Sequence, residues 1–343
     1  MVFIIFRESV TRAHHMLVGA CNPPACPMHA FRPLSRTVIR GATWYQGESN
    51  TGVTTPGADV RQYSCGFAAL IRDWRLKWHA GTLGHTDPDF PFGWVQLNSC
   101  YRSGWAESRT VPPRPVATNW SYSNPPVHPT PGDPLGAWRP CQPCACSNTT
   151  PPCPRGTPCR GQGDGFPSVR WAFEQTLGAV PNGFQAISLD TPSAYGSVHS
   201  PYKQPVGARL ARAALAAAYG QSQHRGPTVG GASIDAADPA TVLIQIDGVG
   251  PGGLELRARV GFELLGADGL WHSAPVIDVR DNHTVRVSVG GADVAPTAVR
   301  YLWYDTPCSN APYSCPVYAV VPALGELSGE LDHLPLGPFM RRI

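Results

Sequence analysis

The first half of the chain alternates between stretches with helical apolar spacing and short runs typical of buried strands. Apolar residues between positions 63 and 78 form one helical face, and Gly81 is placed to end that helix. Polar residues take the opposite side of this predicted helix: Arg72, Asp73, Arg75 and Lys77. Two further helices are predicted over about 169–177 and 202–219.

Runs rich in β-branched and aromatic residues predict strands over 38–45, 92–97 and 184–189. From about residue 228, alternation with glycine-containing turns predicts further strands: 242–246, 254–264, 274–279, 284–289 and 299–304. We therefore predict an α/β domain over 36–225 and a β-sandwich-like domain over 228–343.

Two segments show neither helical nor strand periodicity. Residues 1–35 have no clean pattern and are expected to be irregular. Residues 101–164 are dominated by proline, serine and cysteine, which predicts an insertion or an exposed loop. Cys141 and Cys144 have a zinc-ligand spacing, but no second pair with a finger or ribbon spacing follows and no histidine lies near. Local disulfides or disorder are favoured over a metal site.

Charge and composition narrow the class of protein. A net charge of +3 over 343 residues favours neither nucleic acid nor a membrane surface as a partner, and no long apolar run predicts a bilayer span. The 11 cysteines, with sequons at Asn119, Asn148 and Asn282, favour a secreted protein or one of the lysosomal and secretory pathway. Residues 2–6 are too short for the apolar region of a signal peptide.

Polar residues follow the three predicted strands of the α/β domain. The segment 46–50 follows the first, Asn98 the second and Asp190 the third, and His199 precedes a helix. Ligands of open α/β sheets bind beyond the carboxyl ends of the strands. An amide can stabilise an oxyanion, and a histidine can act as general base. The residue types at these strand ends are therefore those that catalyse acyl transfer. The plainer reading is that these residues brace turns, cap loops or are structural.

The segment Trp44-Tyr-Gln-Gly-Glu-Ser-Asn50 resembles the sialate O-acetylesterase family of the SGNH hydrolase superfamily. The resemblance continues at these segments: 63–75, 90–97, 166–171, 196–199, 300–304 and 336–339. It covers roughly residues 27–340 apart from the insertion. It implies a flavodoxin-like three-layer α/β/α SGNH-hydrolase domain followed by a small all-β domain. It also implies that Cys308 pairs with Cys315.

The resemblance also implies a chemistry. The substrates would be O-acetyl esters of sugars, sialic acids or similar glycans, hydrolysed by a serine and a histidine without a metal or another cofactor. Gly47-Glu48-Ser49-Asn50 matches the oxyanion element of the family, with Asn50 as the donor and Gln46 beside it. His199 matches the catalytic histidine. Asp190 is the nearest upstream acid, because Gly196 and Ser197 stand where the superfamily usually has one.

The nucleophilic serine of the family has no counterpart that we can find. The family pattern is a tight Gly-Asp-Ser-like turn after a first strand. Ser9 lacks the small neighbours that such a turn needs, and Ser49 lies within the oxyanion element. We therefore expect this chain to lack the N-terminal third of a family member and to be nearly inactive. Two other classes remain open: a non-catalytic carbohydrate-binding protein and a secreted, disulfide-bonded structural protein.

Overall fold

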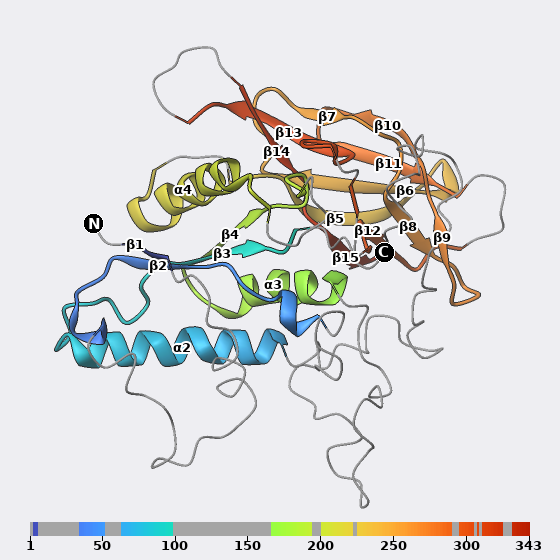
Figure 1. The fold of residues 1–343 in the computed structure, drawn as a ribbon. Helices are drawn as coiled ribbons and strands as arrows, with labels where there is room; N and C mark the ends of the chain where they lie inside the picture. Colours follow the sequence, from blue (N-terminus) through green and yellow to red (C-terminus); the bar gives the residue numbers. More distant parts are fainter. Residues whose placement is uncertain are drawn as a thin grey trace, which may run out of the picture.

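A computed structural model of the protein describes part of the chain. The described residues are 3–5, 34–51, 63–98, 166–193, 200–221, 225–289, 295–304, 307–308, 311–324 and 331–343. The predicted insertion over 101–164 and His199 therefore lie outside them. Two parts are visible in Figure 1: a parallel sheet with helices on both faces, and a stack of strands that ends at the C-terminus. Within the described ranges, no helix has the length and apolar character needed to cross a membrane.

The parallel sheet has four strands in the order β1-β2-β3-β4. Their bounds are β1 Phe3–Ile5, β2 Gly41–Trp44, β3 Phe92–Gln96 and β4 Gly183–Ile187. β2 and β3 fall inside the strands predicted from the sequence, and β4 begins one residue before the strand predicted over 184–189. β1 differs from the irregular segment expected over 1–35, since it pairs with β2 along its whole length. Because neighbouring strands are parallel, their carboxyl ends meet at one edge of the sheet.

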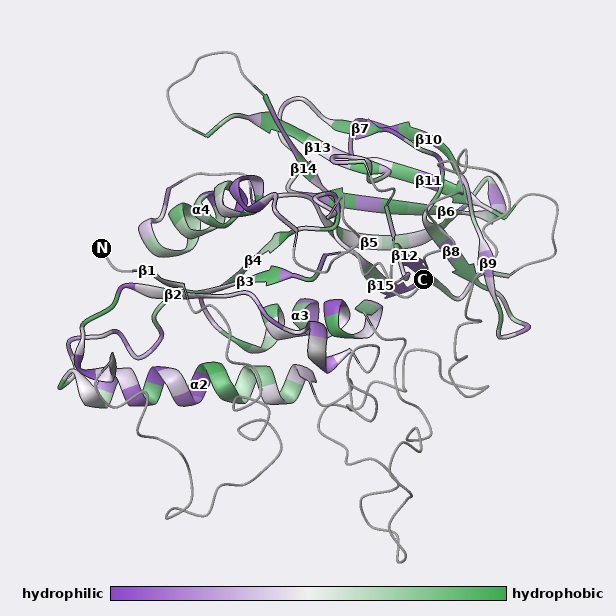
Figure 2. Cartoon of the chain, viewed as in Figure 1, coloured by the Kyte–Doolittle hydropathy of each residue, from purple (hydrophilic) through white to green (hydrophobic). Residues whose placement is uncertain are grey.

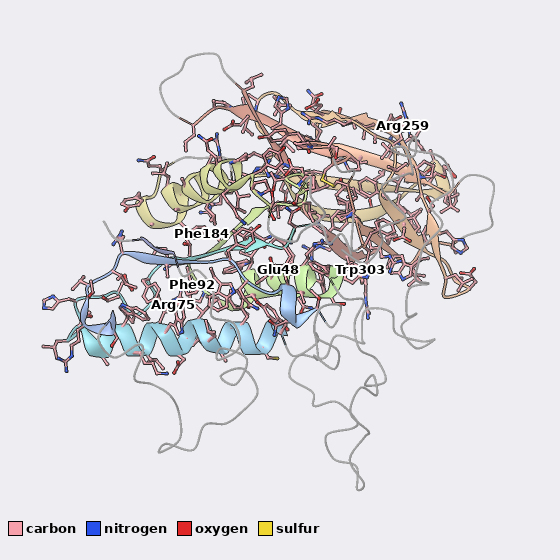
Figure 3. All side chains as sticks on the ribbon, in the orientation of Figure 1. Glu48, Arg75, Phe92, Phe184, Arg259 and Trp303 are labelled. Carbon is pink, nitrogen blue, oxygen red and sulfur yellow. A yellow bond between two sulfur atoms is a disulfide. The ribbon has the colours of Figure 1, made fainter. Side chains whose placement is uncertain are left out.

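Helices cover both faces of this sheet. Helices α2 (Tyr63–Gly81) and α3 (Phe166–Ala179) lie on one face and α4 (Lys203–Tyr219) on the other (Figure 1). Side chains on the strands divide accordingly: Phe92 belongs to the core under α2 and α3, whereas Phe184 packs with Ala213 and Ala214 of α4. Figure 3 shows Phe92 and Phe184 on opposite sides of the strands. Helix α4 ends at Gly220 in the left-handed conformation, as predicted.

The core between the sheet and α2 is built largely of aromatic rings. The buried ring of Phe67 lies 5.4 Å from Trp94 and 5.2 Å from Phe173, measured between centroids. Trp44 lies 5.8 Å from Trp74 in an edge-on contact. Edge-to-face pairs of this kind add about 0.5–1.5 kcal/mol each to the hydrophobic burial. Figure 2 shows apolar and polar segments alternating along α2, and the residues of the predicted apolar face are buried, which confirms that face: Tyr63, Phe67, Ile71, Trp74 and Trp78.

One residue of the predicted polar side of α2 is buried. Arg75 is only 3% exposed, and its guanidinium donates to the carbonyl oxygens of Phe90, at 2.8 Å, and Pro181, at 2.7 Å. These carbonyls belong to the loops that lead into β3 and β4. The placement of Arg75 on the solvent side was therefore wrong, because a buried guanidinium is tolerated where carbonyl oxygens use its donors.

The described elements after α4 are all strands, arranged in three sheets. One sheet has the order β10-β11-β6-β5, formed by Val276–Arg280, Thr284–Ser288, Asp238–Asp247 and Thr228–Asp235. The second, β15-β12-β8-β9, is formed by Phe339–Arg342, Ala298–Tyr301, Phe262–Leu265 and Trp271–Ser273. The third, β14-β13-β7, is formed by Leu331–Pro335, Val317–Pro322 and Leu254–Leu256. A second hydrophobic core draws residues from all three.

The strand predicted over 254–264 is two strands in different sheets, β7 and β8. Gly261 lies between them with a φ of 100°, a conformation that favours glycine. A Cβ atom there would lie 2.8 Å from Leu302 Cδ2. The chain therefore turns at Gly261, where apolar periodicity alone had indicated one continuous strand.

Contacts near the carboxyl edge join the parallel sheet to the β-rich part. The fully buried guanidinium of Arg170 donates to the carbonyl oxygens of Leu97, after β3, and Tyr304, after β12, at 2.8 and 2.6 Å. Tyr313 N donates to Asp190 O at 2.7 Å. Cys308 and Cys315 form a disulfide bond next to this contact, as the family resemblance implied. The edge of the sheet and the β-rich part therefore share polar contacts.

Candidate active site

The turn after β2 is fixed by a glycine. Tyr45 and Gln46 continue the chain from β2, and a short 3₁₀ turn, η3, covers Glu48–Asn50. Between them Gly47 has a φ of 145°. A Cβ atom on it would lie 3.2 Å from each of three atoms: Leu97 Cδ2, Tyr63 Oη and Val169 Cγ1. Because β3, α2 and α3 all close on this point, the turn is held from every side and only glycine fits without strain.

The turn brings two side-chain amides together. Gln46 Nε2 donates to Asn50 Oδ1 at 2.8 Å. The hydroxyl of Tyr63, on α2, lies 3.2 Å from both Gln46 Oε1 and Gln46 O. In this arrangement the nitrogen of the Asn50 amide lies on the side away from Gln46. Among the described residues, no acceptor takes a hydrogen bond from Asn50 Nδ2.

Two tyrosine side chains, Tyr45 and Tyr63, lie beside the same turn and are uncharged. Burial, and next the nearby carboxylate of Glu48, which opposes a second negative charge, raise the pKa of Tyr45 to about 12. Burial likewise raises the pKa of Tyr63 well above its ordinary value. Both phenols therefore keep their protons at physiological pH and can serve as donors. Lys203 Nζ lies 4.2 Å from the centroid of the Tyr45 ring, and Figure 3 places Glu48 at this edge of the sheet.

Asn98, after β3, is used structurally. Its Nδ2 donates to Thr191 O, and its own carbonyl oxygen accepts from Arg170 Nη2 at 2.7 Å. The first bond joins the ends of β3 and β4, and the second joins the end of β3 to α3. The amide of Asn98 is therefore engaged by the backbone, unlike the nitrogen of Asn50.

Asp190, after β4, lies in a buried ion pair. Its carboxylate accepts two hydrogen bonds from Arg209 of α4, at 2.6 and 2.8 Å, and one from Tyr318 Oη at 3.1 Å. Arg209 also donates to Ile187 O at 2.8 Å. Because His199 lies outside the described residues, the predicted contact between Asp190 and His199 stays a prediction.

The structure thus brings together Gln46, Gly47, Glu48 and Asn50 in one turn, as the motif indicated. Two participants were missed. Tyr63 was interpreted only as a core residue of α2, although tyrosine often carries a polar contact at the edge of a core. Arg209, on the predicted helix over 202–219, was not singled out. In the part of the chain that the structure describes, no cluster of three or more histidine, cysteine or acidic residues could hold a metal ion.

The fold is that of a known class of hydrolase. The structure superposes on that of a carbohydrate acetylesterase from Xanthomonas citri with a TM-score of 0.55 and 24% sequence identity. The match covers 92% of this chain and 52% of that protein. No protein-family model matches the sequence. At this identity the superposition defines the fold alone, which is the fold of a carbohydrate acetylesterase.

Comparison of sequences identifies proteins that are related to this chain over much of its length. The sialate O-acetylesterase of Homo sapiens is 30% identical over 199 residues, which are 56% of this chain and 26% of that protein. Those of Mus musculus and Rattus norvegicus are 27% and 26% identical, over 84% and 88% of this chain. The chain is thus related to sialate O-acetylesterases, and the resemblance seen in its motifs is confirmed. It matches 43% and 48% of the mouse and rat proteins, so it spans half of their length or less.

Proposed function

We propose that the chain forms the ester-binding site of a carbohydrate O-acetylesterase and that its ligands are O-acetylated sugars, sialic acids or similar glycans. One observation carries this proposal: Asn50, whose Oδ1 accepts from Gln46, lies at the carboxyl edge of a parallel sheet, the edge at which ligands of open α/β sheets bind. The relationship to sialate O-acetylesterases supports the choice of ester.

The chemistry that such a site assists is acyl transfer. A nucleophile attacks the acetyl carbonyl carbon and gives its proton to a base, for which we propose His199. The carbonyl oxygen then carries negative charge, and Asn50 Nδ2 donates a hydrogen bond to it. Removing one such donor typically lowers kcat about 10²–10³-fold. The bond to the sugar oxygen breaks, that oxygen takes the proton back from the histidine, and water later releases acetate.

The nucleophile is not assigned to a residue of this chain. Neither Ser9 nor Ser49 has the sequence context of the family's serine turn. We therefore propose that these 343 residues by themselves bind the acetylated sugar but hydrolyse it near the uncatalysed rate. Binding and turnover consequently need separate measurements.

Calorimetric titration with an O-acetylated sialic acid and with its non-acetylated form tests the binding site. We expect the acetylated sugar to bind more tightly, and Asn50→Ala to remove the difference while leaving the non-acetylated sugar unaffected. A control, Asn182→Gly, lies at the amino end of β4 at a positive φ that glycine also adopts, and should keep the preference. Equal affinity of the unmodified chain for both sugars would refute the proposal.

Acetate release from the same acetylated sugar tests turnover. We expect the rate to stay at background for the unmodified chain and for His199→Ala alike. A rate near that of a full-length relative, abolished by His199→Ala, would show that this chain does carry a nucleophile. Tight binding of many sugars irrespective of acetylation would instead indicate a carbohydrate-binding protein.

A further inference from the structure

An asparagine that serves an oxyanion has to present the correct end of its amide. Its two ends are nearly equal in size, but only the nitrogen can donate to a carbonyl oxygen. Asn50 lies at the end of the η3 turn, and its backbone N donates to Gly47 O at 2.9 Å. That bond fixes the backbone of Asn50 but does not determine which end of the side-chain amide faces the ligand. The choice must come from a neighbouring side chain.

Gln46 determines which end of the Asn50 amide faces the ligand. Its Nε2 donates to Asn50 Oδ1 at 2.8 Å, so the oxygen of Asn50 is drawn inward and the nitrogen is turned outward. The amide of Gln46 could itself rotate, and then its Oε1 would accept from Asn50 Nδ2. The ester would in that case meet an oxygen, which repels a developing oxyanion.

Tyr63 contacts the other end of the Gln46 amide. Its hydroxyl lies 3.2 Å from Gln46 Oε1, and the phenol is 4% exposed, so its proton depends on protein acceptors. The carbonyl oxygen of Gln46, also at 3.2 Å, is the second acceptor within reach. In the observed orientation the hydroxyl donates toward Gln46 and leaves Gln46 Nε2 for Asn50, whereas after rotation Nε2 would be used by the Tyr63 oxygen instead.

We propose that Gln46 and Tyr63 are positioning residues, which hold the Asn50 amide with Nδ2 toward the ester through two successive hydrogen bonds. The first bond runs from the Tyr63 hydroxyl to Gln46 Oε1 and the second from Gln46 Nε2 to Asn50 Oδ1. The role of the pair rests on the proposed function, but the direction of the two bonds can be tested without a substrate. Gly47 contributes by keeping the turn against the Tyr63 hydroxyl, 3.2 Å from its Cβ position.

The decisive variant is Gln46→Glu. The new carboxylate has nearly the same shape and still accepts from Tyr63, but it cannot donate to Asn50 Oδ1. Asn50 must turn its nitrogen inward to reach that carboxylate. We expect Gln46→Glu to remove the preference for the acetylated sugar as fully as Asn50→Ala, a loss of roughly fivefold for one neutral hydrogen bond. Gln245→Glu, the same chemical change at an exposed position of β6, should leave the preference unchanged.

Tyr63→Phe tests the outer bond. It removes only the hydroxyl, so both orientations of the Gln46 amide become accessible and the preference should fall by a smaller factor than in Gln46→Glu. Tyr219→Phe, at a residue 39% exposed on α4, is the matched control and should have no effect. A Tyr63→Phe variant that equals the unmodified chain would limit the positioning role to Gln46 and overturn the part assigned to Tyr63.

NMR of the side-chain amides gives the independent readout. In the unmodified chain the hydrogen-bonded, downfield proton should belong to Gln46 Nε2. In Gln46→Glu it should belong to Asn50 Nδ2. Downfield Asn50 Nδ2 protons in the unmodified chain would show the reverse direction and overturn the proposal, even if no sugar bound.

The binding data separate the remaining outcomes. Loss of the preference in Gln46→Glu but not in Asn50→Ala would make Gln46 itself the donor, and the positioning role would be refuted. Absence of any preference in the unmodified chain, with the expected NMR pattern, would refute the proposed function and leave the two hydrogen bonds in place.

Discussion

Replacing Arg209 by methionine is expected to destabilise the protein strongly. Asp190 is 0% exposed and Arg209 is 8% exposed, and they form two hydrogen bonds of 2.6 and 2.8 Å. Arg209→Met keeps most of the aliphatic stem but leaves the carboxylate with only the Tyr318 hydroxyl as a side-chain donor among the described residues. Removing one partner of a buried ion pair costs about 3–5 kcal/mol. That is a large fraction of the stability of a typical domain.

The double variant Asp190→Asn/Arg209→Met separates charge from packing. It removes both charges, and the neutral amide can still accept from the Tyr318 hydroxyl. Because neutral replacements of a buried ion pair are often nearly without cost, the double variant should be more stable than Arg209→Met. Asp190→Asn alone should resemble Arg209→Met, since it leaves a buried guanidinium without its counter-ion.

Urea unfolding, followed by tryptophan fluorescence and circular dichroism, measures these free energies. Lys77→Met is the control, because it breaks the Lys77–Asp73 pair of α2, whose side chains are 34% and 50% exposed. Its expected cost is at most about 0.5 kcal/mol. A cost below about 1 kcal/mol for Arg209→Met, or a double variant no more stable than the single one, would contradict the role that we assign to the buried ion pair.

Three further outcomes follow from the structure. Gly47→Ala forces a side chain into a positive φ against three atoms, and should lower the unfolding free energy by roughly 1–3 kcal/mol in urea titration. Arg75→Met leaves the buried carbonyls of Phe90 and Pro181 without this donor, at a cost of about 2–4 kcal/mol, whereas the exposed Arg72→Met should cost far less in the same titration. Burial raises the pKa of Glu174, so the folded state holds its proton more tightly than the unfolded state does. The unmodified protein should therefore lose melting temperature as the pH rises above 4.5 through the folded-state pKa, and Glu174→Gln should abolish that loss.

The regular elements were largely predictable because their apolar residues repeat. Helix α2 has the predicted bounds, and its apolar face is the buried one. Arg75 was misplaced since periodicity treats every arginine as polar, whereas this one is matched to carbonyl oxygens from distant loops. Gly261 was missed as a break, because only the neighbouring Leu302 side chain shows that the chain has to turn there.

The candidate site was predictable in its residues but not in its contacts. The motif placed Gln46, Gly47 and Asn50 together, and the turn confirms that they are neighbours. Which amide donates to which depends on Tyr63, whose hydroxyl comes from a helix that the motif does not include. The partner of Asp190 is Arg209, 19 residues away in the sequence, and no local pattern marks that ion pair.

The guanidinium of Arg170 has a mechanical consequence. It donates to Leu97 O and Asn98 O at the end of β3 and to Tyr304 O after β12. Rotating the β-rich strands against the sheet would separate this cation from one of its acceptors, at about 1.5–3 kcal/mol for each hydrogen bond. Domains joined by small interfaces usually move relative to each other. Here the carboxyl edge of the sheet and the strands beyond it are expected to diffuse and tumble as one rigid unit.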